Sequence, residues 1–128
     1  PKKISWFLTK EEEVQSIVLK NILFESNSAK LREESIFELN ELYEMIKQKS
    51  NFSIEIIGHT DNIGSEEDNL LLSLNRAKVV SDFLVNKGIL RERISCIGKG
   101  ESNPIDDNLN ENGRRNNRRT EFRLSKIK

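Results

Sequence analysis

The chain has 128 residues, of which 35% are hydrophobic and 33% are charged, a composition typical of one small α+β domain with a highly charged surface. Its 21 basic and 21 acidic residues cancel at neutral pH, so overall charge does not favour nucleic acid or an anionic membrane as the partner. A single cysteine excludes an internal disulfide and a cysteine-rich zinc site, and it leaves the redox compartment open.

The apolar pattern of the chain does not predict a membrane-spanning helix. No apolar run approaches the roughly 18 residues that a membrane-spanning helix needs. The sequence begins at Pro1 rather than at a methionine, and we therefore expect a fragment of a longer protein. A signal peptide, a lipid anchor or a membrane domain could belong to the missing part, so the absence of a targeting segment here means little, and any membrane contact would come from there.

The first predicted element is a strand over residues 16–25, which are rich in isoleucine, leucine and valine and are typical of a central strand. Upstream, residues 4–13 favour an extra edge strand or an arm. We therefore expect an N-terminal arm or edge strand over 1–16 and one domain over 17–128.

A helix is predicted over residues 33–49, after a polar, turn-forming stretch. Its apolar positions follow each other at spacings of 3, 4 and 3, which places them on one helical face: Ile36, Leu39, Tyr43 and Ile46. Residues 52–57 then alternate between apolar and polar side chains and predict a second strand, which Gly58 ends.

A second, longer helix is predicted over residues 67–87, with Gly88 as its C-terminal cap. Its expected buried stripe consists of Leu72, Val79, Val80, Phe83 and Leu84. Strands are predicted over 93–98 and 120–127, separated by a long polar connection. The order β-α-β-α-β-β predicts an α+β two-layer sandwich, with the helices on one face of a mixed sheet.

Polar side chains gather where the second strand ends and the long helix begins. Asp61 follows the strand, and Asn69 and Arg76 are seven residues apart on the helix, so they share one face. A carboxylate and a guanidinium at one site suit a zwitterionic amino-acid terminus, because aspartate can take the ammonium and arginine the carboxylate. An ordinary ion pair between Asp61 and Arg76 at the helix start explains the same spacing, so the residues alone leave both interpretations open.

A series of motifs carries a resemblance to a known family. They are GHTD at 58–61, NLLLSLNRAKVV at 69–80, GILR at 88–91, GKGESNP at 98–104 and GRRNNRR at 113–119. In this order they closely resemble the OmpA-like, peptidoglycan-binding domain family. Residues 22–31 also look like the family's opening strand and loop, so the resemblance covers about residues 17–125.

The resemblance implies non-covalent binding of peptidoglycan, through the zwitterionic side-chain end of diaminopimelate in the stem peptide. By matching position, Asp61 would take the ammonium and Arg76 the carboxylate. Thr60 and Asn69 would add hydrogen bonds. Arg118 would flank the stem peptide. The loop that borders the family's pocket contributes one more position, Asn27.

The same resemblance implies an anchor without catalytic residues, metal or cofactor, on a protein at the periplasmic face of the outer membrane or elsewhere in the cell envelope. The missing upstream part could be a β-barrel, a lipid anchor or a periplasmic module, and a flagellar-stator-like wall anchor is an alternative. The chain departs from the family pattern at the rim of the site, at Glu25, Lys99, Arg115 and Asn116.

Metal binding and catalysis are less well supported by the residues. His59 and Asp61 would be a metal pair without the third and fourth ligands that a site needs, and we expect His59 to pack at the strand end and bond the loop backbone. Ser65, Ser73 and Cys96 are nucleophile types, but the single histidine lies inside the ligand motif. Cys96 is expected to be an inert core thiol.

The arginine-rich segment 113–119 is the remaining alternative, from a different functional class. Its four arginines suit phosphates, and a nucleic-acid-binding module would use them. Interleaved stacking aromatics are missing, however, and acidic residues nearby dilute the positive charge. A solvated basic surface, or a surface beside a carboxylate-rich wall polymer, explains the segment better, and we expect no nucleic acid as a partner.

Overall fold

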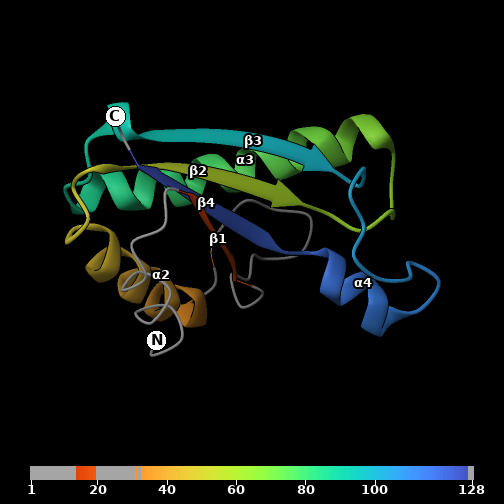
Figure 1. Ribbon diagram of the computed structural model, residues 1–128. Helices are drawn as coiled ribbons and strands as arrows, with labels where there is room; N and C mark the ends of the chain where they lie inside the picture. The colour runs from red at the N-terminus through yellow and green to blue at the C-terminus, as the bar shows by residue number, and fades with distance from the viewer. Residues whose placement is uncertain (1–13, 20–30, 32, 127–128) are drawn as a thin grey trace.

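The computed structural model describes residues 14–19, 31 and 33–126. Its elements, in chain order, are β1 (Val14–Leu19), α2 (Glu33–Ile46), β2 (Phe52–His59), α3 (Glu66–Lys87), the 3-10 turn η1 (Arg91–Arg93), β3 (Ile94–Gly100), α4 (Glu111–Asn117) and β4 (Thr120–Lys126). The four described strands form one sheet in the order β1-β4-β2-β3 (Figure 1). β4 pairs antiparallel with β1 and β2, whereas β2 and β3 are parallel.

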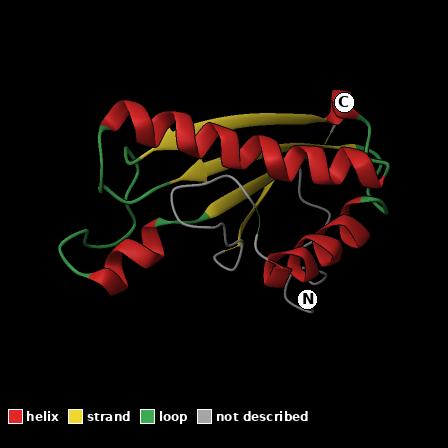
Figure 2. Ribbon diagram, turned by 180° about the vertical axis from the view of Figure 1, so that it is seen from behind, coloured by secondary structure: helices red, strands yellow, loops and turns green. Residues whose placement is uncertain are grey.

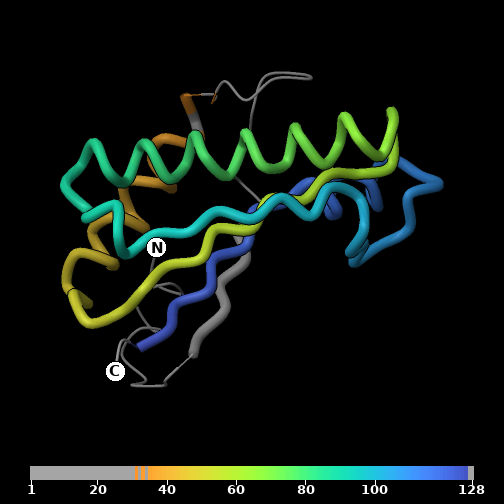
Figure 3. The backbone as a smooth tube through the Cα atoms, turned by 90° about the horizontal axis from the view of Figure 1, so that it is seen from above, coloured from red at the N-terminus to blue at the C-terminus, as the bar shows by residue number. Residues whose placement is uncertain are grey.

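The two longer helices cover one face of this mixed sheet. α2 and α3 both lie in front of the strands when the molecule is seen from behind (Figure 2), and the view from above shows both on the same side of the sheet (Figure 3). The predicted α+β architecture is therefore confirmed. Among the described residues, none of the helices has the combination of length and apolar character that crossing a bilayer requires.

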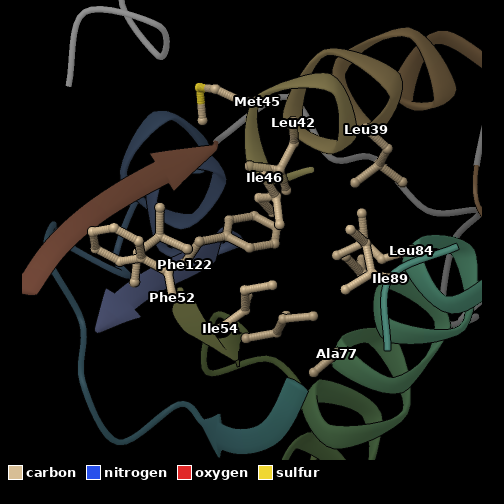
Figure 4. Packing of buried hydrophobic residues seen from close by; sticks show 13 residues of the cluster. Leu39, Leu42, Met45, Ile46, Phe52, Ile54, Ala77, Leu84, Ile89 and Phe122 are labelled. Atoms are coloured by element: carbon tan, nitrogen blue, oxygen red, sulfur yellow. The ribbon is translucent and has the colours of Figure 1, made fainter. Parts of the chain in front are cut away.

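The hydrophobic core fills the space between these helices and the sheet (Figure 4). β2 alternates as predicted, because Phe52, Ile54 and Ile56 are buried while Ser53 and Glu55 are half-buried. The buried apolar residues come from both helices, β2, β4 and the turn after α3: Leu39, Leu42, Met45, Ile46, Phe52, Ile54, Ile56, Ala77, Val80, Leu84, Ile89, Phe122 and Leu124.

The buried face of α2 is rotated relative to the predicted one, and the helix ends at Ile46 rather than at residue 49. Ser35 and Leu42 are fully buried, whereas Ile36 is 39% exposed. The stripe therefore runs through 35, 39, 42 and 46. A fully buried serine at its start explains why an apolar pattern alone placed Ile36 in the core.

The buried face of α3 consists largely of small side chains, which corrects the predicted stripe. Val80 and Leu84 are buried as expected, but Leu72, Val79 and Phe83 are only half-buried. The other positions on the buried face are Asn69, Ser73, Ala77 and Ser81. Small residues are needed there because the helix backbone runs directly over glycines of the sheet.

Two of these glycines, Gly58 in β2 and Gly98 in β3, set how close α3 lies to the strands. A Cβ on Gly58 would overlap the backbone oxygen of Ser73, and one on Gly98 would lie 2.6 Å from the backbone nitrogen of Leu74. The Ser73 hydroxyl uses this proximity to accept a hydrogen bond from the Gly100 N–H at 2.8 Å. The start of α3 is thereby fixed against the carboxyl ends of β2 and β3.

Two further expectations need correction. β1 (Val14–Leu19) lies at the edge of the described sheet, not in its centre. The expected arm upstream of β1 and the continuation of the strand to residue 25 lie outside the described residues. α4 occupies part of the long polar connection, where no helix was predicted.

Candidate functional site

The candidate site lies at the end of the sheet where β2 and β3 finish. Because these strands are parallel, their carboxyl ends meet at one edge, and the start of α3 and the α4–β4 corner lie beside it (Figure 1). The Thr60 N–H donates to the Gly100 oxygen at 2.8 Å and joins the two strand ends. Gly64, at a φ of +94°, supplies the left-handed turn that leads the chain into α3.

Asp61 is the buried carboxylate of this site. Its Oδ1 accepts the backbone N–H of Ile63 at 2.9 Å, so the side chain shapes its own loop. Its Oδ2 accepts Arg118 Nη1 at 2.6 Å in an ion pair. The Asp61 side chain is only 10% exposed, so water screens this pair less than it would an ordinary surface pair.

Asn69 and Thr60 hold the loop around Asp61. The Asn69 amide group donates to the backbone oxygens of Ile63 at 3.0 Å and Asp61 at 3.3 Å, and to Glu101 Oε1 at 2.9 Å. The Thr60 hydroxyl donates to the Asp61 backbone oxygen at 2.8 Å. Asn69 therefore ties α3 to the loop, a role that its spacing did not predict. Glu101 was not among the predicted site residues.

Arg76 lies on the same face of α3 as Asn69, as predicted, and is half-buried. Burial lowers the pKa of Arg76, the positive charge of Arg118 acts in the same direction, and the charge of Asp61 acts in the opposite one. The guanidinium of Arg76 is thus within electrostatic range of both Asp61 and Arg118. The site brings one buried carboxylate together with two guanidinium groups.

Arg118 bridges two carboxylates. Nη1 donates to Asp61 at 2.6 Å, and Nη2 donates to Glu111 Oε2 at 2.6 Å. Burial lowers the pKa of Arg118, but the hydrogen bonds that Arg118 donates to Glu111 and Asp61, together with the charges of these two carboxylates, outweigh burial and raise it overall. The sequence predicted Arg118 only at the flank of the ligand, whereas it pairs directly with Asp61.

The α4 segment is held in place by Asn117, which is fully buried. Its Oδ1 accepts the N–H groups of Ile105 at 2.8 Å and Asp106 at 2.9 Å, and its Nδ2 donates to the Asp106 oxygen at 3.0 Å and to Asn108 Oδ1 at 2.8 Å. The connection before α4 is therefore clamped onto the helix. Since Arg118 is the next residue, this clamp fixes the direction from which Arg118 enters the site.

Gly113 completes this packing, because a Cβ there would overlap the backbone oxygen of Asp107. The helix begins at an Asn110 side chain that accepts the Gly113 N–H at 2.7 Å. Asparagine at the position before a helix is a common start signal, and it was the signal in the sequence that could have revealed α4.

Arg119 and His59 lie under the site rather than in it. Arg119 is buried and donates to the Asn103 oxygen at 2.9 Å and to Glu121 Oε2 at 2.9 Å. His59 packs at the end of β2, as predicted, with its backbone N–H on the Arg119 oxygen at 3.0 Å. The ring does not bond the loop backbone as expected: neither ring nitrogen has a hydrogen-bond partner among the described residues, and Nε2 is 3.4 Å from Glu121 Oε1. Burial, and next the charge of Arg119, lower the pKa of His59.

The remaining candidates fall outside the site. Cys96 is half-buried with its thiol 3.5 Å from the Ala77 oxygen, and burial raises its pKa, which disfavours the reactive thiolate. The part of the chain that the structure describes contains no group of three or more histidine, cysteine or acidic side chains placed to hold a metal ion. Asn27 lies outside the described residues.

The arginines of segment 113–119 do not form one continuous basic surface. Arg118 and Arg119 are engaged in the intramolecular pairs described above, and Arg114 donates to Glu111 at 3.3 Å and to the Asn108 oxygen at 3.0 Å. Arg115 is exposed. This arrangement reduces the positive charge available for a phosphate backbone.

Solved structures with the same fold are similar over most of the chain. A MotB-like protein from Desulfovibrio vulgaris has a TM-score of 0.80 at 26% identity, covering 90% of this chain and 75% of that protein. The cell wall anchor of the T6SS from Pseudomonas aeruginosa has a TM-score of 0.74 at 29% identity, covering 88% and 80%.

Curated proteins match at higher identity. Outer membrane porin F of Pseudomonas aeruginosa is 37% identical over 102 residues, covering 79% of this chain and 29% of the porin. Peptidoglycan-binding protein ArfA of Mycobacterium tuberculosis is 39% identical over 101 residues, covering 79% and 31%. The chain thus spans less than a third of the length of these relatives. The sequence pattern of the OmpA family matches residues 23–118, and the chain belongs to this family.

Proposed function

We propose that this domain binds peptidoglycan without covalent chemistry or turnover and anchors a larger protein of the cell envelope to the wall. Membership of the OmpA family supports this proposal, as do a relative named as a peptidoglycan-binding protein and a fold neighbour described as a cell wall anchor. The single observation that carries it is the buried carboxylate of Asp61 within range of two guanidinium groups, Arg76 and Arg118.

The ligand group that fits these charges is the zwitterionic side-chain end of diaminopimelate in the stem peptide. In this proposal the ammonium binds Asp61 and the carboxylate binds Arg76, with Arg118 beside it. Ion-paired hydrogen bonds are shorter and stronger than neutral ones, and an arginine fork matches a carboxylate. A head group with both charges on one carbon would satisfy both halves of the site.

Thr60 and Asn69 have a different part in this proposal from direct donation to the ligand. Their polar hydrogens already bond the backbone around Asp61, at 2.8 Å for Thr60 and at 3.0 Å from Asn69 to Ile63. We infer that they keep the Asp61 carboxylate oriented toward the ligand. The predicted contact of Asn27 with the stem peptide remains a prediction.

The affinity of one such site is expected to be modest. Hydrogen bonds to charged groups contribute roughly 1.5–3 kcal/mol each, so two of them with a few neutral bonds correspond to about micromolar to millimolar dissociation constants. A wall polymer repeats the stem peptide many times. Many copies of the anchored protein would therefore bind the wall strongly together through avidity, although each single site is weak.

The relatives and fold neighbours support two candidates for the kind of protein that carries this domain. Relatives named outer membrane porin F and outer membrane protein A support a location at the periplasmic face of the outer membrane. The similarity to a MotB-like protein supports a flagellar-stator-like wall anchor as the second candidate. A nucleic-acid-binding module is less favoured, because Arg118 and Arg119 are committed to internal carboxylates.

Sedimentation with purified, protein-free sacculi tests the proposal. The domain is expected to pellet with sacculi, and Asp61→Asn and Arg76→Gln are expected to leave it in the supernatant. Arg115→Gln is the matched control, because Arg115 is an exposed arginine on α4 with the same charge. The proposal fails if the wild-type domain stays in solution, or if both site variants pellet as the wild type does.

A further inference from the structure

Arg118 occupies the place on Asp61 that an incoming ammonium group needs. Asp61 Oδ1 is committed to its own loop, through the Ile63 N–H at 2.9 Å. Oδ2 is the oxygen that faces Arg118, at 2.6 Å. A cationic ligand must therefore share or displace the guanidinium of Arg118 before it can pair with this carboxylate.

We propose that the Asp61–Arg118 ion pair makes the site select ligand heads that carry an ammonium and a carboxylate together, and that Glu111 is the positioning residue that holds Arg118 during the exchange. This inference rests on the proposed function of the site. The exchange is non-covalent: Asp61 passes from Arg118 to the ligand ammonium, and Arg118 passes from Asp61 to the ligand carboxylate, which Arg76 binds as well.

The balance of charge explains the selection. An ammonium group alone would take Asp61 from Arg118 and leave Arg118 with Glu111 as its one remaining carboxylate among the contacts described above. Its positive charge would then act on Arg76 without the opposing charge of Asp61; burial first, and next the charge of Arg118, already lower the pKa of Arg76. A zwitterionic head supplies a carboxylate at the same moment, so neither guanidinium loses its counter-charge. A ligand with a carboxylate alone would leave Asp61 paired with Arg118. It would make no ion pair with Asp61 and would therefore bind less tightly than a zwitterionic head.

Glu111 has the geometry to hold Arg118 through this exchange. It accepts Nη2, the nitrogen that does not bond Asp61, at 2.6 Å, and its side chain is 52% exposed at the rim. The Arg118 hydrogen bond is the first cause of the lowered pKa of Glu111, and the charge of Arg118 is the next. Without Glu111, both terminal nitrogens of Arg118 are free to turn to Asp61, which strengthens the competing pair.

The test uses three probes with one aliphatic chain: norleucine (as the D and L forms), pentylamine, which lacks its carboxylate, and hexanoate, which lacks its ammonium. Each is titrated into the isotopically labelled domain and followed by NMR, including the side-chain resonance of Arg118. The variants are Arg118→Gln and Glu111→Gln, with Arg115→Gln as the exposed control on the same helix.

The wild type is expected to prefer norleucine over both single-charge probes, and norleucine alone should shift the Arg118 resonance. Arg118→Gln should bind pentylamine about two- to fivefold more tightly than the wild type, because a partly exposed competing ion pair is removed. Glu111→Gln should lower the affinity for norleucine by a similar factor without changing the melting temperature of the domain. Arg115→Gln should change the affinity for neither norleucine nor pentylamine.

The outcomes separate this inference from the proposed function. If the wild type binds norleucine in neither form, the exchange is wrong, and the sedimentation with sacculi decides the proposed function separately. If norleucine binds and Asp61→Asn abolishes it, but Arg118→Gln binds pentylamine no more tightly than the wild type, the exchange is wrong while the proposed function stands. An equal loss of norleucine and pentylamine in Glu111→Gln would likewise assign Glu111 a merely structural role.

Discussion

Arg118 Nη1 lies 2.6 Å from Asp61 Oδ2, although the two residues are 57 positions apart in the chain. This contact joins the loop after β2 to the corner between α4 and β4. The site therefore forms only when the sheet has brought the end of β2 next to the start of β4. Features that fix either side of this contact should control binding as well as stability.

Asn117→Ala should destabilise the domain and weaken ligand binding. The fully buried Asn117 amide bonds backbone groups of Ile105 and Asp106, and alanine removes all three of these hydrogen bonds. We expect a loss of about 2–4 kcal/mol in the free energy of unfolding, measured by urea denaturation. Asn116→Ala, which removes one exposed bond to Asp106, is the control and should cost far less. Equal stability of the two variants would contradict the clamp.

Gly98→Ala should loosen the start of α3. A Cβ at Gly98 would lie 2.6 Å from the Leu74 nitrogen and 2.7 Å from the Ser73 hydroxyl, so the helix must move away from β3. Overpacking of this kind costs about 1–3 kcal/mol, and the shift should also reduce affinity because Arg76 lies two positions along the helix from Leu74. The matched control is Lys99→Ala at the exposed neighbouring position. A crystal structure of Gly98→Ala with α3 unmoved would refute the reasoning.

The part that sequence predicts well is the part governed by local periodicity. The alternation in β2 and the helical spacing of Asn69 and Arg76 depend on residues close in the chain, and the structure has both as predicted. The buried face of α3 was predicted wrongly because it consists largely of small residues. A search for strongly apolar side chains does not identify serine or alanine as buried positions. Only the position of Gly58 and Gly98 under the helix makes small residues necessary there.

Contacts between segments that lie far apart in the chain were also not predicted from the sequence. No local pattern could predict that Arg118 pairs with Asp61, since that depends on how β4 aligns with β2. β1 was expected in the centre of the sheet because of its apolar composition, but edge and central strands differ in neighbours rather than in composition alone. α4 has seven residues and contains a glycine, so its periodicity is too short to be recognised.

Stability should fall on mild acidification because of His59. Burial lowers its pKa from the ordinary value of 6.5, with Arg119 and Lys99 acting in the same direction and Glu121 against them. The folded protein then binds fewer protons than the unfolded chain, so the contribution of neutral His59 is fully present above about pH 6.5 and is lost as the pH falls below it. Urea denaturation between pH 8 and pH 5 measures this slope.

A histidine-free variant provides the control for this pH dependence. His59→Gln should remove most of the slope between pH 7 and pH 5.5, since acidic side chains titrate mainly at lower pH. If the variant and the wild type lose stability in parallel over this range, the slope arises elsewhere.

The central claim is that Asp61 and Arg76 together bind a zwitterionic amino-acid head. Isothermal titration of the domain with free meso-diaminopimelate, compared with ornithine and lysine, tests it most directly. We predict a micromolar to millimolar dissociation constant for diaminopimelate, at least about tenfold weaker binding in Asp61→Asn and in Arg76→Gln, and no change in Arg115→Gln. The absence of binding by every one of these diamino acids, or unchanged affinity in both site variants, would contradict it.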